Sequence, residues 1–315
     1  MAISVIIPTY NEESHIKDLI FELLKSKNVI SEIFICDAGS TDSTVNIIKD
    51  ICAQFEIVKY LHNKNKFVSF AFNEAYKLSS GKYIALLGAH AFYPINYLEV
   101  GLKCLENGEA DVVGGPLNQK GWGQNGIAIA LAMSSIFGVG NTEFRTSKKK
   151  QFVDSVAFAI YRKEIFEKVG LLNVNLKRNQ DDELHYRIKK FGYQILMVPE
   201  MESTYYVRES FYRLFNQYYE YGLYKPLVFK LVKKGMRLRH FVPSLFVLYI
   251  FSLPFLYLII GNFAFFPLLL YFVFAFYFAF EKTNSPDLIL RVFLAFLILH
   301  VSSGVGFLIG IFKKS

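Results

Sequence analysis

Short apolar runs and polar turns alternate along the first hundred residues, which predicts alternating strands and helices. Each run is rich in β-branched residues and stops at turn-forming residues, as buried parallel strands do. Alternation at this spacing indicates βαβ units with right-handed crossovers, hence a doubly wound α/β sheet. The expected strands are Ala2–Ile7, Glu32–Cys36, Phe55–Tyr60 and Tyr83–Leu87, and the expected helices are Glu13–Leu24, Ser43–Ala53 and Phe67–Leu78.

The pattern from Asp111 to about Tyr206 is less regular, and we expect it to form the acceptor side of the molecule. Glycines at 114–115 and 121–126 are typical of loops. Gly192 is expected to end a helix as its C-cap. The elements predicted here are a strand at Ser155–Tyr161, helices at Lys163–Val169 and Asp182–Phe191, and a strand at Gln194–Val198.

Three long apolar segments close the chain, at Phe241–Ile260, Phe263–Phe280 and Leu288–Phe312. Each is near the roughly 20 residues that a helix needs to cross a bilayer. The alternative is a buried core, but long, aromatic-rich and nearly uncharged runs favour a membrane. Only Gly261 and Asn262 join the first two segments, which predicts a tight hairpin. The terminal lysines favour the cytoplasmic side, which three crossings forbid, so one segment is expected to be interfacial or re-entrant.

Composition and charge agree with a membrane protein of a reducing compartment. Hydrophobic residues make up 53% of the 315 residues, and the formal net charge is +8. Basic residues gather at Lys148–Lys150 and between Lys230 and His240, just before the first apolar segment, which indicates an anchor on anionic lipid rather than a nucleic-acid site. Three cysteines without a C-x-x-C pair predict neither a disulfide framework nor a zinc site.

No basic stretch precedes the first strand, so we expect no cleavable signal peptide and a catalytic part in the cytosol.

Two turn motifs follow the first two strands, at Pro8–Glu12 and Asp37–Asp42. In an open α/β sheet a nucleotide binds beyond the carboxyl ends of the strands, and a carboxylate there accepts hydrogen bonds from a ribose or base. Asp37 is therefore the expected nucleotide contact, with a plain turn residue as the alternative. Asp42 can equally cap the helix that follows it.

The segments Val5–Glu12 and Cys36–Asp42 resemble the nucleotide-binding half of the family 2 glycosyltransferases, inverting enzymes of the GT-A fold. The resemblance implies a nucleotide-sugar donor, expected to be a UDP-sugar. It also implies that Pro8, Thr9 and Glu12 line the donor pocket beside Asp37.

The general base is expected in the run Asn179–Arg187. By resemblance to the family, Asp181 matches the base that deprotonates the acceptor hydroxyl, although Gln180 stands where a Glu is usual. Clustered carboxylates raise one another's pKa, which favours Asp181 as a base near neutral pH. Asp182 and Glu183 are lesser candidates, and the alternative is that these acids cap the helix.

The metal motif departs from the family pattern. Where the family has Asp-x-Asp after the fourth strand, this chain has Gly88–Ala91, so the first carboxylate is missing. His90 occupies the last position of the motif, and an imidazole can ligate Mn²⁺ or Mg²⁺, the former better. Ala89, within the same motif, is expected to contact the bound donor. The run Ala89–Pro94 resembles the succinoglycan-type glucosyltransferase branch, which Phe137–Gly140 and Gln217–Gly222 also match.

Processive family members carry Gln-x-x-Arg-Trp before the membrane, where this chain has Gln217 followed by Glu220-Tyr221 in place of Arg-Trp. The departure favours addition of a single sugar. The same stretch is equally typical of an amphipathic interfacial helix from about Ser210 to Lys234.

Taken together, the residues and the resemblance predict a cytosolic GT-A domain over residues 1–235 and a membrane domain over 236–315. The expected protein is a multi-pass enzyme of the inner membrane that transfers a hexose from a UDP-sugar to a lipid-diphosphate-linked glycan, with a divalent cation and without nucleic acid. The alternatives are transfer to a polyprenyl phosphate, and a catalytically impaired scaffold of a polysaccharide assembly complex.

Overall fold

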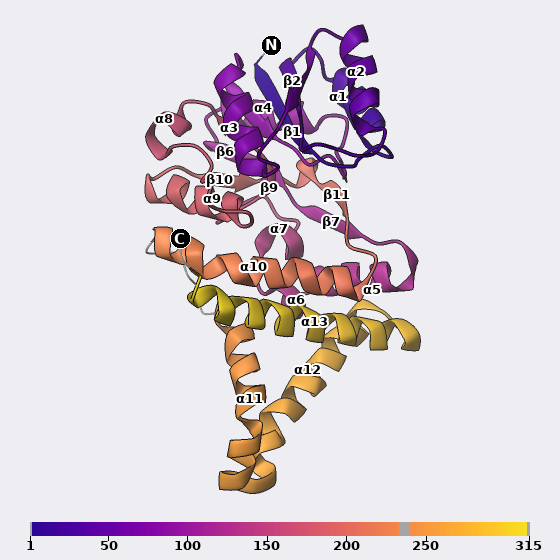
Figure 1. Ribbon diagram of the computed structural model, residues 1–315, viewed down its shortest axis with the longest axis vertical. Coiled ribbons are helices and arrows are strands. Elements are labelled where there is room, and N and C mark those ends of the chain that lie inside the picture. Colours follow the sequence, from indigo (N-terminus) through magenta and orange to yellow (C-terminus); the bar gives the residue numbers. More distant parts are fainter. Residues whose placement is uncertain (1, 233–239, 314–315) are drawn as a thin grey trace. The chain divides into compact units, whose positions relative to one another are not determined.

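The computed structural model describes residues 2–232 and 240–313, and the chain forms two compact units (Figure 1). The first unit comprises Met1–Asn118 and Ser147–Tyr205. The second comprises Gln119–Thr146 and Tyr206–Ser315, so it contains an internal segment as well as the apolar helices.

The first unit is built on an eight-stranded mixed sheet of order β3-β2-β1-β4-β9-β6-β10-β8. The strands β1 to β4 are parallel, and β9 runs antiparallel to both β4 and β6. The predicted α/β sheet is therefore confirmed. The strands are β1 Ile3–Thr9, β2 Ile30–Asp37, β3 Val58–His62, β4 Tyr83–Leu86, β6 Val112–Gly115, β8 Gln151–Phe152, β9 Ala157–Arg162 and β10 Ile195–Met197.

Helices cover the sheet because its strands are apolar on both faces. Within β1, Val5, Ile6 and Ile7 are fully buried, as expected for a strand packed between two helical layers. The register pairs Thr9 with Asp37, which brings the ends of β1 and β2 to one edge of the sheet. The helices of this unit are α1 Ile16–Lys25, α2 Thr44–Gln54, α3 Val68–Leu78, α4 Tyr97–Glu106, α8 Ile165–Val169 and α9 Gln180–Lys190.

The glycine pair 114–115 lies in strand β6, so its interpretation as a loop signal is wrong. A Cβ on Gly115 would lie 1.7 Å from the carbonyl oxygen of Met201, in the short 3₁₀ helix η1 Pro199–Met201. Glycine is needed here for close backbone packing.

A second, three-stranded sheet of order β5-β11-β7 joins β5 Ala91–Phe92, β11 Ser203–Tyr206 and β7 Leu117–Lys120.

The second unit is helical. The glycine-rich run 121–126 is only partly a loop, because α5 begins at Gly123. A Cβ on Gly121 would lie 2.0 Å from the backbone of Gly126, so these glycines allow a tight entry into the helix. The helices of this unit are α5 Gly123–Met133, α6 Ile136–Val139, α7 Glu143–Thr146, α10 Phe211–Val232, α11 Val242–Ile260, α12 Phe266–Lys282 and α13 Pro286–Ile311.

The helices α11 and α12 form the predicted hairpin, joined by the 3₁₀ turn η3 Gly261–Phe265. The Tyr249 hydroxyl donates to Ala264 O at 2.7 Å, and the rings of Phe246 and Tyr271 stack at 4.3 Å. Two stretches of the described chain, Val242–Lys282 and Pro286–Ile311, are long and apolar enough to cross a membrane. Of the predicted basic stripe, Lys233, Lys234, Arg237 and Arg239 lie outside the described residues.

Candidate active site

Two loops at the carboxyl edge of the sheet are tied together by hydrogen bonds. The amide of Asn11 donates to Ser40 Oγ at 2.8 Å, and the amide of Thr41 donates to Asn11 Oδ1 at 2.8 Å. The Glu12 amide donates to Thr44 Oγ1, also at 2.8 Å. Asn11 has a φ of 53°, a left-handed conformation that Asn tolerates better than most residues. The loops after β1 and β2 therefore support each other.

Asp37 is fully buried and accepts hydrogen bonds from its own turn. Its Oδ2 accepts from the amides of Gly39 at 2.8 Å and Ser40 at 3.0 Å, and its Oδ1 accepts from Ser40 Oγ. A carboxylate has about four acceptor positions, and the turn uses three of them. Asp42 lies one residue before Ser43, the N-cap of α2, and accepts from the Thr44 amide at 3.1 Å and from the Glu13 amide at 3.3 Å, so it binds both the first residue of the helix and the neighbouring loop.

Glu12 and His90, predicted separately from two motifs, contact each other. The distance from Glu12 Oε1 to His90 Nδ1 is 3.2 Å. The His90 side chain is 42% exposed and that of Glu12 is 16% exposed, so the pair opens to solvent on the histidine side. The ring of Tyr205 from β11 lies 5.5 Å from the imidazole. Because Glu12 engages Nδ1, the Nε2 atom is the one left to meet a ligand.

Phe158 fills the space beside Gly88, the position at which the expected carboxylate is missing. A Cβ on Gly88 would lie 2.6 Å from Cε1 of Phe158, so an aromatic ring fills the space that a side chain would enter. Phe158 has a φ of 51°, which is strained for a bulky residue. Its ring packs edge-on against Tyr93, whose hydroxyl accepts from the Gly88 amide at 2.7 Å. The buried Ala89 follows. The packing around the loop after β4 thus leaves space only for a glycine at position 88.

The donor set fits a metal ion that is held jointly with a substrate, not one enclosed by protein. The described residues hold no group of three or more His, Cys, Asp or Glu side chains able to bind a metal. However, metal-binding histidines usually donate their other ring nitrogen to a carboxylate, which is the arrangement of His90 with Glu12. Catalytic Mg²⁺ commonly takes one or two protein ligands and completes its shell with phosphate oxygens and water.

Asp181 lies in the first turn of α9, together with Asp182 and Glu183. Asn179 precedes the helix in a left-handed conformation, with a φ of 59°. Burial, and secondarily the charge of Asp181, raises the pKa of Tyr161 in β9. Asp181 therefore lies close enough to β9 for its charge to affect the Tyr161 hydroxyl.

A buried histidine that sequence reasoning missed holds α9 on the sheet. His185 lies one turn after Asp181; its Nδ1 is 2.8 Å from Ser155 Oγ and its Nε2 is 3.0 Å from the Tyr161 hydroxyl. Burial lowers the pKa of His185 to about 4, against a smaller opposing effect of Asp182. Ser155 precedes β9, which starts at the edge where its antiparallel neighbours β4 and β6 end. The middle of α9, one turn after Asp181, is thus tied through Ser155 to the sheet edge that also carries Glu12 and His90.

Glu183 has a structural partner. Its carboxylate receives two hydrogen bonds from Arg187, at 2.7 and 2.8 Å, and is nearly buried. The same guanidinium donates to the carbonyl oxygens of Val169 and Leu171, so it fastens the loop after α8 to α9. This geometry favours Asp181 over Glu183 as the reactive carboxylate.

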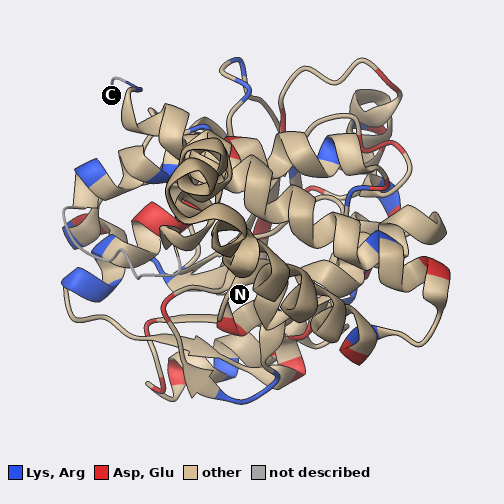
Figure 2. Cartoon of the chain, turned by 90° about the horizontal axis from the view of Figure 1, so that it is seen from below, with Lys and Arg blue, Asp and Glu red and all other residues tan. Residues whose placement is uncertain are grey.

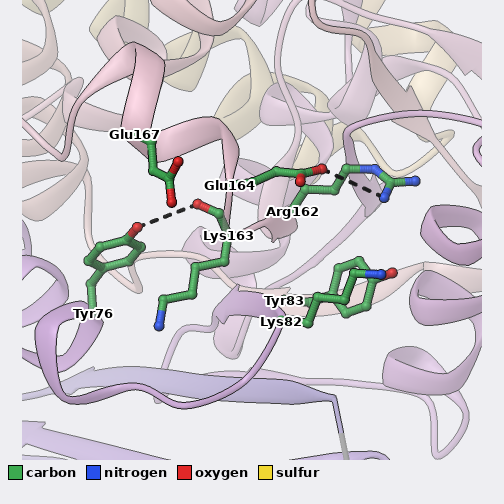
Figure 3. A pocket seen from close by; sticks show the side chains of 7 residues that line it. All are labelled: Tyr76, Lys82, Tyr83, Arg162, Lys163, Glu164 and Glu167. Atoms are coloured by element: carbon green, nitrogen blue, oxygen red, sulfur yellow. Dashed lines mark hydrogen bonds and ion pairs between the residues drawn. The ribbon is translucent and has the colours of Figure 1, made fainter.

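A cavity of about 220 Å³ lies elsewhere in the same unit (Figure 3). Its lining includes Lys82 and Tyr83 at the start of β4 and Arg162 at the end of β9, so it opens at the amino edge of the parallel strands. Arg162 lies 4.0 Å from Glu164, and Lys163 Nζ donates to Ser79 O at 2.5 Å. None of the predicted donor or base residues lines this cavity.

In the second unit, the stretch Gln217–Gly222 lies within α10. The Gln217 amide donates to the Tyr221 hydroxyl at 3.0 Å, and a Cβ on Gly222 would lie 2.2 Å from Ser303 O of α13. Gly222, one residue after the position of Trp in processive members, therefore permits close contact between α10 and α13. The predicted helix from about Ser210 to Lys234 corresponds to α10 at Phe211–Val232.

The comparison with protein families decides the identity. Residues 4–170, more than half of the chain, match the family described as glycosyl transferase family 2. The chain is a family 2 glycosyltransferase. The matched segment contains the two loops, the Glu12–His90 pair and β9.

Two curated relatives of this glycosyltransferase are similar over most of its length. The succinoglycan biosynthesis protein ExoA of Rhizobium meliloti is 33% identical over 221 residues, 69% of this chain and 67% of the relative. A Methanococcus voltae enzyme is 29% identical over 74% of both chains; it is named dolichyl N-acetyl-α-D-glucosaminyl phosphate 3-β-D-2,3-diacetamido-2,3-dideoxy-β-D-glucuronosyltransferase. The glycosyltransferase thus has relatives in polysaccharide and lipid-linked glycan synthesis.

Among solved structures, the mannosyltransferase PcManGT of Pyrobaculum calidifontis, in complex with GDP-Man and Mn²⁺, has the same fold. The TM-score is 0.62 at 16% identity, and the match covers 99% of this chain and 88% of that one. The likeness confirms the predicted GT-A fold of the glycosyltransferase.

Proposed function

We propose that this glycosyltransferase inverts the anomeric centre of a hexose as it moves it from a UDP-sugar to a lipid-linked glycan at the cytoplasmic face of the inner membrane. The observation that carries the donor half is the contact between Glu12 and His90 at the carboxyl edge of the sheet. That edge is where nucleotides bind in open α/β sheets.

The donor pocket is assigned to the loops after β1, β2 and β4. Asp37 orients the ribose or base with its remaining acceptor position, and Pro8, Thr9 and Ala89 line the pocket. The hydrogen bonds between the two loops support this role, because they preorganise the backbone around a bound nucleotide.

His90 directs its Nε2 atom to the donor diphosphate, and Glu12 fixes the ring by engaging Nδ1. A divalent cation, Mn²⁺ by preference for an imidazole ligand, would bind His90 together with the diphosphate oxygens. When bound, it neutralises charge that develops on the leaving diphosphate. The PcManGT structure, a complex with both GDP-Man and Mn²⁺, supports a cation of this class.

Asp181 acts as the general base. The acceptor hydroxyl oxygen forms a bond to the anomeric carbon while the bond from that carbon to the diphosphate oxygen breaks, which inverts the configuration. The hydroxyl proton goes to the Asp181 carboxylate, and the nucleoside diphosphate leaves with the bonding electrons. The anchoring of α9 through His185 supports this role, because a base has to be held within reach of one hydroxyl.

A lipid-linked acceptor is supported by the two apolar stretches and by the dolichyl-linked acceptor in the name of the Methanococcus voltae relative. The relative in succinoglycan biosynthesis supports a role in surface polysaccharide assembly.

Calorimetry on the detergent-purified full chain tests the donor site. We expect UDP and a UDP-sugar to bind more tightly with Mn²⁺ than without it, and His90→Ala to remove the Mn²⁺ dependence. Tighter binding of GDP than of UDP would overturn the choice of donor. Failure of both nucleotides to bind under all conditions would favour the scaffold alternative.

Acceptor assays then separate the remaining alternative. Membranes containing the enzyme receive a radiolabelled UDP-sugar with either a lipid-diphosphate-linked oligosaccharide or a plain polyprenyl phosphate. Transfer only to the oligosaccharide is the expected result, and transfer only to the polyprenyl phosphate would contradict it.

A further inference from the structure

The two apolar stretches that could cross a membrane differ in how much of each the protein itself covers. In the α11–α12 hairpin only 11% of the most apolar window is buried, whereas in α13 the share is 44%. The hairpin carries no Lys, Arg, Asp or Glu from Val242 to Phe280. Figure 2, in which charged residues are blue or red, therefore draws this stretch in tan. Its apolar surface is therefore free to face lipid, while much of α13 is packed against protein.

The partner of α13 along most of its length is α10. A Cβ on Gly306 would lie 2.2 Å from Tyr219 O, and one on Gly310 would lie 2.3 Å from Leu223 O. The earlier residue of α10 contacts the earlier residue of α13, and the later contacts the later, so the two helices run parallel. Their backbones are in direct contact. Small residues spaced four apart are typical of such close helix contacts. The depth of α13 is consequently set by the depth of α10.

The helix α10 is not suited to cross a bilayer. Within its 22 residues it carries Arg213, Glu220, Lys225 and Lys230, spread from one end to the other. A charged side chain at the bilayer centre is strongly unfavourable, and such residues are rare in membrane-spanning helices. A helix with four such residues belongs at the membrane surface, where charged heads reach water.

Contacts at the end of α13 keep it at the same level. Lys230 Nζ donates to Ile311 O at 2.9 Å and to Lys313 O at 3.4 Å, so a charged residue of α10 caps the last turn of α13. Lys313 Nζ lies 3.7 Å from the ring centre of Tyr224. The carboxyl end of α13 is thus bound to charged and amphipathic residues of α10.

The start and middle of α13 are also tied to other parts of the second unit. Arg291 donates to Asn125 Oδ1 in α5, and His300 Nε2 lies 2.8 Å from Phe137 O in α6. The Phe137 ring contacts both His300 and Phe296 edge-on. A helix that crossed the membrane alone would have to give up these polar contacts.

We propose that α13 does not cross the membrane but lies along the same face as α10, with only the α11–α12 hairpin inserted among the described residues. The proposal rests on the membrane location in the proposed function. From Leu290 onward the exposed side chains of α13 are apolar, namely Leu290, Leu294, Ile309 and Ile311, and they would rest on the acyl boundary as those of an interfacial helix do.

This arrangement removes the conflict in the sequence between three apolar segments and a basic end. A hairpin enters and leaves the membrane on one side, so Lys313 stays on the side from which α11 enters, and the preference of Lys and Arg for the cytoplasmic face makes that the cytoplasmic side. The hairpin is long enough for insertion: the 19 residues of α11 span about 28 Å as a helix, against a hydrocarbon core of about 30 Å.

The test uses the full chain with one epitope tag at each end. Spheroplasts and inside-out vesicles are treated with a protease, and each tag is followed by blotting. We expect both tags to be cleaved in inside-out vesicles and both to be protected in spheroplasts. Cleavage of the tags from opposite faces would show that α13 crosses and would overturn the proposal.

A carbonate wash separates this failure from failure of the proposed location. Release of the intact chain into the soluble fraction would overturn membrane insertion itself, and with it both proposals about the membrane. Retention of the chain, with both tags on the cytoplasmic face, supports α13 as an interfacial helix. The amino-terminal tag serves as the internal control, because it reports the side of the catalytic unit in every preparation.

Discussion

The two halves of the first unit hold their polar side chains in different ways. Around β1 and β2, the side chains are held by hydrogen bonds between two largely exposed loops, such as Asn11 to Ser40 and Thr41. Around β9, a single buried imidazole, His185, holds α9 through Ser155 and Tyr161. Water can replace a lost bond in the first case, whereas a buried group that loses its partner pays its full desolvation cost. The exposed loop contacts of the donor side should therefore tolerate single changes that the buried contacts of the base side do not.

The largest effect is expected from Asp181→Asn, which removes the proposed base without changing side-chain volume. Turnover should fall about 1,000-fold, within the usual contribution of a general base, while UDP-sugar affinity stays within about twofold. Steady-state rates and calorimetry measure the two quantities. Asp182→Asn is the matched control in the same turn of α9 and should retain most activity. Equal losses in the two variants would remove the assignment.

Next in size is the acid sensitivity caused by His185. Its pKa is about 4 in the folded protein and lies near 6.5 when unfolded, so the unfolded state binds more protons between these values. Its contribution to stability is complete above pH 6.5 and is lost as the pH falls toward 4, by on the order of 3 kcal/mol. Thermal melting from pH 7.5 to 4.5 should show a smaller decline for His185→Gln than for the wild type. Parallel declines would contradict this origin.

Gly88→Ala tests whether the packing of Phe158 excludes any side chain at position 88. The added Cβ would lie 2.6 Å from Phe158, and overpacking of this kind costs about 1–3 kcal/mol. Denaturant unfolding should show the loss, and Phe158→Leu in the same chain should recover part of it. If the single variant is as stable as the wild type, Phe158 does not account for the glycine.

The smallest effect is expected from Glu12→Gln on the exposed donor side. Loss of the carboxylate beside His90 should weaken the apparent affinity for Mn²⁺ in the presence of UDP by about tenfold. Glu13→Gln is the control, because this neighbouring carboxylate accepts from the Ser43 amide at 2.9 Å and has no role in the proposed donor site. An unchanged Mn²⁺ titration in Glu12→Gln would separate Glu12 from metal binding.

The local order of strands and helices could be predicted from the sequence because apolar periodicity and turn residues are local signals. Strand β4 begins at Tyr83 and α3 ends at Leu78, as expected. Glycines were the weak point. Those at 114–115 indicated a loop, but they lie in β6, where they allow close approach to Val156 and Met201, which are distant in the sequence. Gly123 and Gly126 also indicated a loop, but they lie in the first turn of α5.

The candidate site was predictable only as separate motifs. Sequence reasoning named Glu12 and His90 for different roles, and their contact depends on a sheet that places β1 beside β4. His185 gave no signal, because a histidine in a charged helix is usually exposed. Its burial follows from the packing of α9 on β9.

The sequence by itself determined the apolar strands, the turn motifs, the family and the length of the apolar segments, since each depends on residues close together in the chain. Only the tertiary structure decided which apolar helix is covered by protein. The stretches Val242–Lys282 and Pro286–Ile311 have nearly the same mean hydropathy, 2.2 and 2.3, but Gly306 and Gly310 bring α13 against α10, whose charges are the ground for proposing that both lie at a surface. Hydropathy measures a segment alone, whereas its environment depends on what it packs against.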